Sequence, residues 1–506
     1  IDGLDRGEYR LLYVAPERLV LPSFLASLDR WDVRLIAVDE AHCVSEWGHD
    51  FRPEYRQIAT LRERYPAVPL LALTATATDR VRDDIERFLD LRSPQRYVAS
   101  FNRPNLRYNV FEKRDPSAQL LAWCTARSGE SGIVYVQSRN SAEDLAERLS
   151  KAGIKARPYH AGLLPQARAR NQELFIRDEI SVICATIAFG MGINKPNVRY
   201  VVHYDVPKNL EGYYQETGRA GRDGLASDCA LFFSGGDAAK QRHFIRMIPD
   251  AVERNQADRL LRMMLDFAMT PQCRRAYLLR YFGEADVPDE CGNCDNCITP
   301  AERIDATIAA RKVLSCVYRI RSHGGFATGE QHVVDVLLGN KNEKVRTWGH
   351  DGISTFGIGQ EYAKGEWLAF ISELLRLGCL EKNPIHKTLD LTDEGMKAIK
   401  EQRTFEFAKP RAVTGAKKGR KRKVAPDDAF EVGLFEVLRV LRKRLADEQG
   451  IPPYIIFSDA TLRELSIRRP TTPDAFLRIN GVGDVKLERY GDVFLSAIQS
   501  NAPAAL

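Results

Sequence analysis

The chain contains 506 residues, of which 44% are hydrophobic and 28% are charged, and its formal net charge is +6. These values exclude a disordered or collagen-like chain and allow about three to five globular domains. No run approaches the roughly 18 consecutive apolar residues of a membrane-spanning helix, and the first residues lack the basic-then-apolar order of a signal peptide. We therefore expect no membrane partner.

Short apolar runs alternate with helical patterns through residues 1–235. Runs of this length, rich in β-branched residues, predict buried parallel strands joined by crossover helices. The fold class expected is multidomain α/β, with two parallel-sheet lobes, 1–99 and 100–235, that divide near Ser100. The expected strands lie within residues 10–16, 34–40, 69–78, 131–138, 180–186, 198–205 and 228–234.

Four further segments follow the two lobes. Residues 236–300 are helical and then cysteine-bearing, and residues 301–405 read as helices followed by a strand pair. A basic linker is expected over 406–426, because residues 409–423, "KPRAVTGAKKGRKRK", carry eight basic residues and no acid. This linker is either merely solvated or also attracted to phosphate backbones, and both can hold together. Residues 427–500 form a compact helical pattern.

Two adjacent carboxylates, Asp39 and Glu40, follow the expected strand in "LIAVDEAH". Open α/β sheets bind ligands at the carboxyl ends of their strands. In a nucleoside triphosphatase the aspartate would hold Mg²⁺ through water and the glutamate would orient the attacking water. An isolated pair would more simply be a solvated turn, so the hypothesis depends on what accompanies it.

Further polar and glycine-rich segments accompany the pair in chain order. "LTATAT" (73–78) ends the next expected strand, although alone it could be a threonine-rich helix N-cap. Gly190 and Gly192 offer close backbone approach to a ligand. In "YYQETGRAGRDG" (213–224), helical spacing would place Gln215, Arg219 and Arg222 on one face, suited to a γ-phosphate across a cleft.

The cysteines favour a metal site over a disulfide framework. Of ten, six lie in apolar or mixed surroundings, and four follow the pattern Cys-x17-Cys-x2-Cys-x2-Cys. We expect Cys273 on a helix and the other three in a turn, together binding a closed, structural Zn²⁺; an iron–sulfur cluster is the alternative. The neighbouring Arg274 and Arg275 would contact DNA or be solvated. The four ligands expected are Cys273, Cys291, Cys294 and Cys297.

These motifs, in this order, resemble superfamily-two helicases and specifically the RecQ DNA helicases. "YVAPERL", "DEAH", "TATAT", "YHAG" (159–162) and "QETGRAGRDG" carry the resemblance, which runs from Leu12 to about Ile498. It implies that Asp39 and Glu40 are the metal and water carboxylates and that His42 couples the site to DNA. It further implies that Gly190, Gln215, Arg219 and Arg222 serve ATP binding or hydrolysis, and that the cysteines bind zinc.

The resemblance also assigns DNA contacts. "SEWGHDFRPEY" (45–55) looks like the family's aromatic-rich loop, whose Trp47, Phe51, Arg52 and Tyr55 would meet single-stranded DNA, although Trp47 and Phe51 could instead pack in a core. Residues 301–405 resemble a winged helix, and residues 451–491 resemble the helicase-and-RNase-D C-terminal (HRDC) domain. The remaining candidates are His160 in "YHAG", His386 at the hairpin tip, either a strand-separating wedge or an ordinary turn residue, and Tyr454, which could equally fill the small core.

No Gly-x-x-x-x-Gly-Lys-Ser/Thr segment, the usual loop around the β- and γ-phosphates, occurs in the 506 residues. The sequence therefore looks like a RecQ protein without the front of its first lobe. We favour an incomplete sequence over an evolved loss, because the other motor motifs are intact. We expect little ATP turnover from the 506 residues alone.

Two main hypotheses follow. The first is an ATP-, Mg²⁺- and Zn²⁺-dependent helicase that moves 3′ to 5′ on single-stranded DNA in recombination, repair and replication, with forked duplexes and single-stranded DNA-binding protein as partners, in the bacterial cytoplasm near the nucleoid. The second is an ATPase-deficient DNA-binding remnant that uses its zinc, winged-helix and HRDC modules. An RNA helicase is a weaker third, since such motors do not usually carry these modules.

Overall fold

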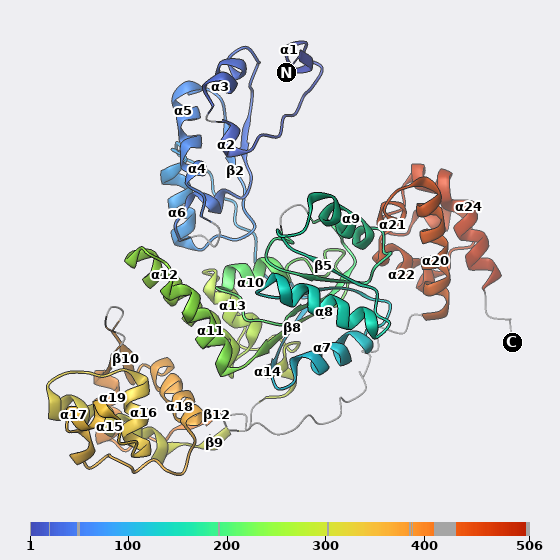
Figure 1. Ribbon diagram of the computed structural model, residues 1–506. Coiled ribbons are helices and arrows are strands. Elements are labelled where there is room, and N and C mark those ends of the chain that lie inside the picture. The colour runs from blue at the N-terminus through green and yellow to red at the C-terminus, as the bar shows by residue number, and fades with distance from the viewer. Residues whose placement is uncertain are drawn as a thin grey trace. The chain divides into compact units, whose positions relative to one another are not determined.

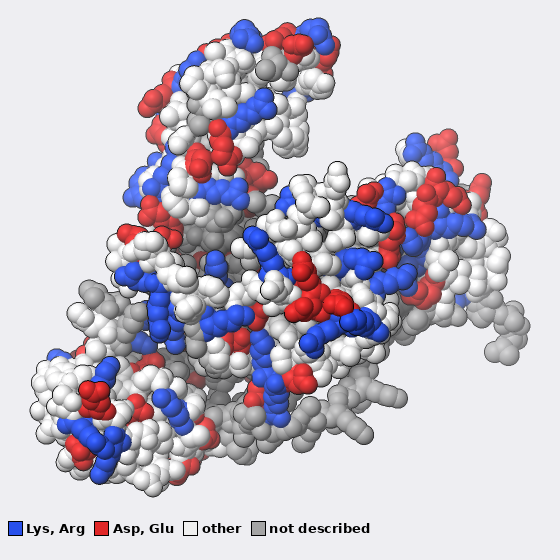
Figure 2. Space-filling view, viewed as in Figure 1, with Lys and Arg blue, Asp and Glu red and all other residues white. Residues whose placement is uncertain are grey.

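The computed structural model describes residues 2–19, 21–47, 51–190, 193–300, 303–383, 386, 388–408 and 432–501. The chain divides into two compact units, residues 1–298 with 420–506, and residues 299–419. Figure 2 shows Lys and Arg side chains interspersed with Asp and Glu over the face in view. No helix among the described residues is both long and apolar enough to cross a membrane.

A six-stranded parallel sheet, of which β5 and β8 are labelled in Figure 1, forms the second lobe. Its strand order is β3-β8-β7-β4-β6-β5. Its central strands are buried along their whole length, as the continuous apolar runs predict. The strands are β3 (Leu106–Glu112), β4 (Ser131–Tyr135), β5 (Ala156–Tyr159), β6 (Val182–Ala185), β7 (Val198–His203) and β8 (Ser227–Phe233). The helices are α7 (Pro116–Thr125), α8 (Arg139–Lys151), α9 (Pro165–Ile176) and α10 (Leu210–Thr217).

The first lobe contains the parallel pair β1 (Ile36–Val38) and β2 (Leu70–Ala72). The prediction that these strands are fully buried is wrong, since Ala37 in β1 and Leu71 in β2 are exposed. The strand predicted over 10–16 is also wrong: these residues are irregular up to Pro16, where a short helix begins. The helices are α1 (Asp2–Asp5), α2 (Pro16–Leu19), α3 (Pro22–Leu28), η1 (Ala41–Val44), α4 (Pro53–Arg56), η2 (Gln57–Ala59), α5 (Thr60–Arg64) and α6 (Asp79–Phe88).

The cysteine-bearing segment continues the core of the second lobe. Phe267 and Leu278 from this segment share one buried cluster with Leu106 and Tyr213 from the lobe. Apolar contact of this kind makes the two segments one packed body. The helices are α11 (Gly235–Arg246), α12 (Ala251–Met269), α13 (Arg274–Tyr281) and α14 (Asp295–Ile298).

The unit of residues 299–419 packs helices around the buried Trp367, Phe370 and Leu314. Its predicted strand pair is confirmed as the antiparallel hairpin β10 (Leu380–Lys382) and β11 (Leu389–Leu391). Glu406–Ala408, expected to begin the linker, instead form β12 beside β9 (Arg303–Asp305); the apolar Phe407 is buried there. The helices are α15 (Thr307–Gly324), α16 (Glu330–Leu338), α17 (Glu343–Thr347), η3 (His350–Gly352), α18 (Lys364–Arg376) and α19 (Asp393–Lys400). The basic run 409–423 lies outside the described residues.

The C-terminal pattern is helical, as predicted. Its core gathers around Phe457, Leu462 and Phe494, which are fully buried. The helices, red in Figure 1, are α20 (Val432–Gln449), α21 (Pro453–Ile456), α22 (Asp459–Arg468), α23 (Pro473–Leu477) and α24 (Asp484–Ser500).

Candidate functional site

The two carboxylates stand directly after β1, as the sequence predicts. Asp39 is exposed, and its Oδ1 accepts a hydrogen bond of 2.9 Å from the backbone N–H of Glu40. Glu40 adopts a left-handed conformation with φ 49°, which costs a non-glycine residue on the order of 1 kcal/mol. This conformation turns the chain sharply at the strand end and directs Glu40 into the adjoining pocket.

His42 joins the carboxylate turn to the threonine-rich segment. It is 1% exposed, its Nδ1 lies 2.9 Å from Thr74 Oγ1, and the same nitrogen lies 3.4 Å from Glu40 Oε2. Thr78 does stand at the N-cap position of α6, but its side chain makes no capping bond. Two other threonines of the segment lie at the site: Thr74 contacts His42, and Thr76 lines the adjoining pocket. The motif pointed to this segment, but spacing did not single out either residue.

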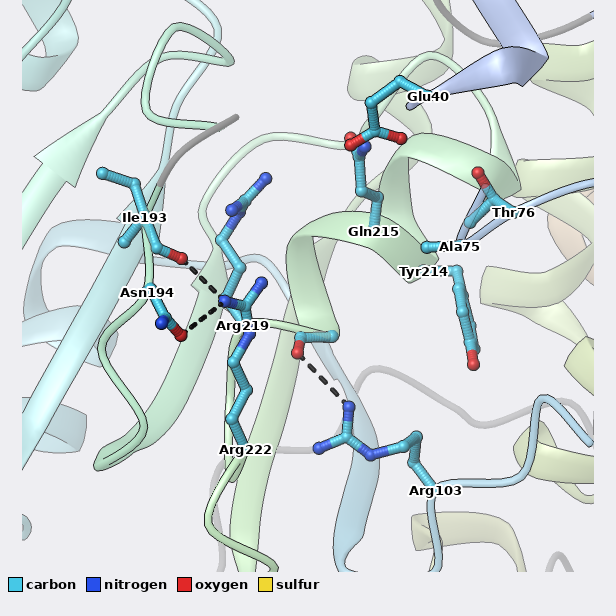
Figure 3. Close-up of a pocket in the computed structure, with 11 residues that line it drawn as sticks. Glu40, Ala75, Thr76, Arg103, Ile193, Asn194, Tyr214, Gln215, Arg219 and Arg222 are labelled. Atoms are coloured by element: carbon cyan, nitrogen blue, oxygen red, sulfur yellow. Dashed lines mark hydrogen bonds between the residues drawn. The ribbon is translucent and has the colours of Figure 1, made fainter. Parts of the chain in front are cut away.

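A pocket of about 390 Å³ lies where both lobes contribute side chains (Figure 3). The first lobe supplies Glu40, Ala75 and Thr76. Thr76 is 2% exposed, and its Oγ1 has no hydrogen-bond partner among the described residues. The second lobe and the segment before it supply Arg103, Ile193, Asn194, Tyr214, Gln215, Gly218, Arg219 and Arg222. A carboxylate, an unpaired hydroxyl and three guanidinium groups thus surround one space.

The prediction that Gln215, Arg219 and Arg222 share one helix face is wrong for the arginines. Helix α10 ends at Thr217, and both arginines lie in the following turn because Gly218 ends the helix. The structure nevertheless brings all three side chains to the pocket.

The arginines form a crowded, partly buried cationic cluster. Arg219 is 4% exposed, and its Nε has no partner among the described residues. Arg222 donates a 2.7 Å hydrogen bond to the carbonyl of Ile193. Burial, followed by the charges of Arg219 and Arg103, lowers the pKa of Arg222. An anion with several oxygens would relieve this repulsion and satisfy the open donors.

Gly190 lies next to Arg219 of this cluster but does not line the pocket. A Cβ placed there would stand 3.1 Å from the carbonyl of Ile187 and 3.4 Å from Arg219 Nη2. The close backbone approach expected of Gly190 is therefore to Arg219. Asp39 and His42 also lie outside the residues that line the pocket, and Gly192 lies outside the described residues.

The aromatic segment 45–55 divides between core and surface. Tyr55 is buried in the first lobe's core, and burial raises its pKa to about 12. Trp47 is half-buried, with the Arg80 guanidinium 3.1 Å from its ring centroid. Phe51 and Arg52 are also half-buried, and Arg56 lies over the Phe51 ring at 4.8 Å. Tyr55 is thus a packing residue, whereas Trp47, Phe51 and Arg52 keep part of their surface in solvent.

The remaining predicted DNA-contact residues lie in separate elements. His160 is 3% exposed, and its Nε2 lies 3.0 Å from Glu143 Oε1. His386 is an exposed turn residue whose N–H donates to Asn383. Tyr454, in α21, is half-buried, and burial raises its pKa. His160 and Tyr454 belong to one compact unit, and His386 belongs to the other.

The four predicted metal ligands converge. Their sulfur atoms all lie within 4.8 Å of one another, with Sγ–Sγ distances of 3.5 Å for Cys294–Cys297 and 3.9 Å for both Cys273–Cys294 and Cys291–Cys297. Four thiolates at the usual Zn–S bond length would stand about 3.8 Å apart in a tetrahedron. The donor set fits a closed tetrahedral zinc site.

Backbone N–H groups support these sulfur atoms. Cys273 precedes α13 as its N-cap rather than lying within the helix, and its Sγ accepts from the N–H of Ala276 at 3.4 Å. The N–H of Arg274 donates to Cys294 Sγ at 3.4 Å. Such bonds stabilise thiolate charge and orient the ligands.

The prediction that Arg274 and Arg275 contact DNA or solvent is wrong. They are 3% and 8% exposed, respectively. Arg274 pairs with Asp295 at 2.9 Å, and Arg275 donates to backbone carbonyls of residues 103–106. Both guanidinium groups make internal contacts. They do so because the N-terminus of α13 lies in the packed core that the cysteine-bearing segment shares with the second lobe.

Two parallel-sheet lobes, a pocket lined from both, and an attached four-cysteine module define the class of nucleotide-dependent helicases. Family models match the chain in the same order as these parts. They are the DEAD/DEAH box helicase (2–85), helicase conserved C-terminal domain (112–224), RecQ zinc-binding (235–298), RQC domain (300–415) and HRDC domain (431–498). The four-cysteine module is thus a zinc-binding module rather than an iron–sulfur site.

The chain belongs to the RecQ family of ATP-dependent DNA helicases. It is 42% identical over 501 residues to the ATP-dependent DNA helicase RecQ of Haemophilus influenzae, covering 98% of this chain and 80% of that protein. It is 40% identical over 504 residues to the enzyme of the same name from Bacillus subtilis, covering 99% and 82%.

Proposed function

We propose that the pocket between the lobes binds and hydrolyses Mg²⁺-ATP to drive movement on DNA. Asp39 would hold the metal ion through water, and Glu40 would orient the attacking water. Thr76 would donate its hydroxyl hydrogen to a phosphate oxygen. Arg219 and Arg222 would stabilise the charge that develops on the transferred phosphoryl group. When bound, Mg²⁺ would neutralise phosphate charge beside these residues.

One observation carries the proposal: Glu40 and Thr76 from one lobe line the same pocket as Gln215, Arg219 and Arg222 from the other. Hydrolysis at such a junction can change how the lobes sit on a bound strand, because the charges that hold them together change with the nucleotide state.

The DNA side of the proposal follows from the family. The chain would move 3′ to 5′ on single-stranded DNA and open forked duplexes in recombination, repair and replication, in the bacterial cytoplasm at the nucleoid. Trp47, Phe51 and Arg52 would contact the unpaired strand, with His160, His386 and Tyr454 as further DNA contacts. Their partial or complete exposure supports this role for Trp47, Phe51, Arg52, Tyr454 and His386. Exposure does not support it for His160, which is buried beside Glu143. Single-stranded DNA-binding protein is the proposed protein partner.

A second candidate function is DNA binding without hydrolysis. The zinc-binding, RQC and HRDC matches support both candidates, because each concerns modules outside the pocket.

ATP hydrolysis with and without single-stranded DNA separates the two candidates. The 506-residue chain and a form carrying a phosphate loop ahead of Ile1 would be compared, each with Glu40→Gln. We expect DNA-stimulated hydrolysis only from the form with the loop, and its loss in Glu40→Gln with retained binding of a fluorescent ATP analogue. Robust hydrolysis by the 506 residues alone would contradict the expected need for the loop. Its absence from both forms, with DNA binding intact, would favour the second candidate.

A further inference from the structure

The segment Ser100–Leu106, "SFNRPNL", connects the two lobes and is called the strap below. Its Arg103 lines the pocket, but the guanidinium group of Arg103 already donates hydrogen bonds to backbone carbonyls. We propose that the strap is a positioning device: held by the zinc module, it fixes the turn 218–225 that carries Arg219 and Arg222. The consequence for catalysis rests on the proposed role of these two arginines.

The strap holds the turn through five hydrogen bonds. Arg103 Nη1 donates to the carbonyl of Gly218 at 3.3 Å, and Nη2 donates to those of Ala220 and Gly221 at 3.1 and 2.9 Å. Figure 3 shows the first of these bonds beside the pocket. Asn105 Nδ2 adds bonds of 2.8 and 3.0 Å to the carbonyls of Gly221 and Leu225.

The first of these contacts fits the end of α10 electrostatically, since Gly218 is the C-cap of that helix, whereas Ala220 and Gly221 lie in the turn that follows. The last carbonyls of a helix lack intrahelical partners and carry partial negative charge, so a guanidinium group beside them is favourable. One planar fork that bonds three carbonyls also fixes their relative positions, which a flexible ammonium group does not.

Gly221 shows independently how closely the turn fits the strap. Its φ of +56° is a left-handed conformation, and a Cβ there would stand 2.4 Å from Asn105 Nδ2 and 2.7 Å from the carbonyl oxygen of Leu225. A side chain would therefore push the turn away from the strap. The glycine between Arg219 and Arg222 is required by this contact, apart from any contact with a ligand.

The zinc module holds the strap from its other side. Arg275, two residues after the ligand Cys273, donates through Nη2 to the carbonyls of Arg103, Pro104 and Leu106 at 3.3, 3.1 and 2.6 Å. Because Cys273 is the N-cap of α13, the metal site fixes the start of the helix that carries Arg275.

Residues just beyond the opposite end of α13 hold the beginning of the strap. The ring of Phe282 stacks on Phe101 with centroids 4.5 Å apart and an interplanar angle of 13°. Glu284 accepts a 2.6 Å hydrogen bond from the Phe101 N–H and bonds of 3.0 and 3.1 Å from Ser100 Oγ. Direct contacts therefore run from Cys273 through α13 and the strap to the turn that carries the two arginines.

The test measures amide hydrogen exchange of residues 214–225 in the 506-residue chain. Arg103→Ala and Asn105→Ala should each raise exchange in this peptide while zinc content stays unchanged. Arg114→Ala is the control, since Arg114 pairs only with Glu112 on the surface among the described residues. Arg275→Ala and removal of zinc by a chelator should raise exchange in the strap and the turn, but not in the central strand β4. Unchanged exchange in Arg103→Ala and Asn105→Ala would overturn the proposal.

Catalysis supplies the second measurement, on the form with a phosphate loop. Arg103→Ala should lower kcat roughly tenfold or more, with a smaller change in the KM for ATP. Arg103→Lys should resemble Arg103→Ala, because it keeps the charge but loses the fork; recovery by lysine would overturn the proposal and make Arg103 a direct phosphate contact. Raised exchange with unchanged kcat would support the positioning and refute the role of the arginines. If Arg275→Ala does not fold, Asn105→Ala still tests the proposal, since the Asn105 side chain bonds to the turn and not to α13.

Discussion

The side chains of His42 and Thr74 meet at 2.9 Å inside the first lobe, joining the turn after β1 to the segment after β2. His42 is 1% exposed and also approaches Glu40. Thr74 also accepts from the N–H of Thr76, at 3.2 Å. Two hydrogen bonds thus link the pocket's Thr76, through Thr74, to His42, which lies beside Glu40.

The first prediction concerns this pair. Thr74→Val keeps the shape of the side chain but removes the hydroxyl partner of a buried imidazole nitrogen, which should cost about 1–3 kcal/mol of stability. It should also weaken the stimulation of ATP hydrolysis by single-stranded DNA in the form that carries a phosphate loop. Thermal unfolding and hydrolysis at increasing DNA concentration measure the two effects. Thr60→Val is the control, since the Thr60 hydroxyl lies on the surface and donates to the nearby carbonyl of Gln57. Equal effects in both variants would contradict the prediction.

The second prediction concerns Trp47. Its ring is half-buried beneath the guanidinium of Arg80, so one face is covered in the absence of DNA. If the ring stacks on a base, Trp47→Ala should weaken single-stranded DNA binding by about 1–3 kcal/mol and reduce DNA stimulation, while basal hydrolysis stays nearly unchanged. Fluorescence anisotropy with labelled DNA measures the affinity. Loss of the cooperative unfolding transition would instead identify Trp47 as a core residue of the first lobe.

Sequence patterns predicted the second lobe better than the first, for a physical reason. Strands β4, β6 and β7 lie inside a sheet and are buried on both faces, so most of their residues are apolar and the runs are easily recognised. β3 and β5 were missed because Arg107 and Asn109 interrupt one and Arg157 and Pro158 the other. Both are edge strands of the sheet, where polar residues and proline are tolerated.

In the candidate site too, residues in contiguous motifs could be predicted from the sequence, whereas residues that act through distant segments could not. Glu40, Arg219 and the cysteines were found because their motifs are contiguous and their chemistry restricts the residue type. Arg103 and Asn105 were not found, since their roles arise from contacts with segments up to 120 residues away in the sequence. Thr76 was not singled out within its threonine-rich segment, because only the folded chain shows which threonine lines the pocket. Helical spacing also misplaced the arginines, because periodicity does not show where Gly218 ends the helix.

The third prediction concerns acid stability of the unit of residues 299–419. His332 and His350 are buried and joined by a 2.7 Å contact between Nε2 and Nδ1. Burial, then the charge of His350, lowers the pKa of His332 from 6.5 to about 4; burial and then His323 lower that of His350. Asp335 opposes the shift of His332, and Lys344 adds to it. A folded pKa below the unfolded one means that the unfolded chain takes up protons first.

Stability of this unit should therefore be complete above pH 6.5 and fall as the pH drops from 6.5 towards 4, by on the order of 2 kcal/mol for His332. Urea unfolding followed by the fluorescence of Trp348 and Trp367 measures it across this range. His332→Gln, which cannot titrate, should flatten the slope, whereas exposed His386→Gln should leave it unchanged. The same slope in His332→Gln would show that other groups cause the acid sensitivity.

The fourth prediction concerns the zinc site. Replacing any one of its four cysteines by serine should remove the metal, because a hydroxyl is a far poorer ligand than a thiolate and the remaining shell opens to water. Residues 288–297 contain mostly Gly, Asn, Asp and Cys and bury little apolar surface of their own, so metal binding must contribute free energy of folding. Cys294→Ser should therefore lower solubility and raise protease sensitivity between 270 and 300, with weaker DNA binding.

A matched control is Cys316→Ser, a buried cysteine in α15 that lies outside the cluster; it should perturb packing without changing metal content. Elemental analysis of the purified chain decides the identity of the metal, with about one zinc per chain expected for a single four-thiolate site. Iron accompanied by visible absorbance, or a chain that keeps its fold without metal, would refute the assignment. Because Cys273 begins α13, whose Arg275 holds the strap, zinc loss should also reach the turn with Arg219 and Arg222, a defect that Cys316→Ser should not share.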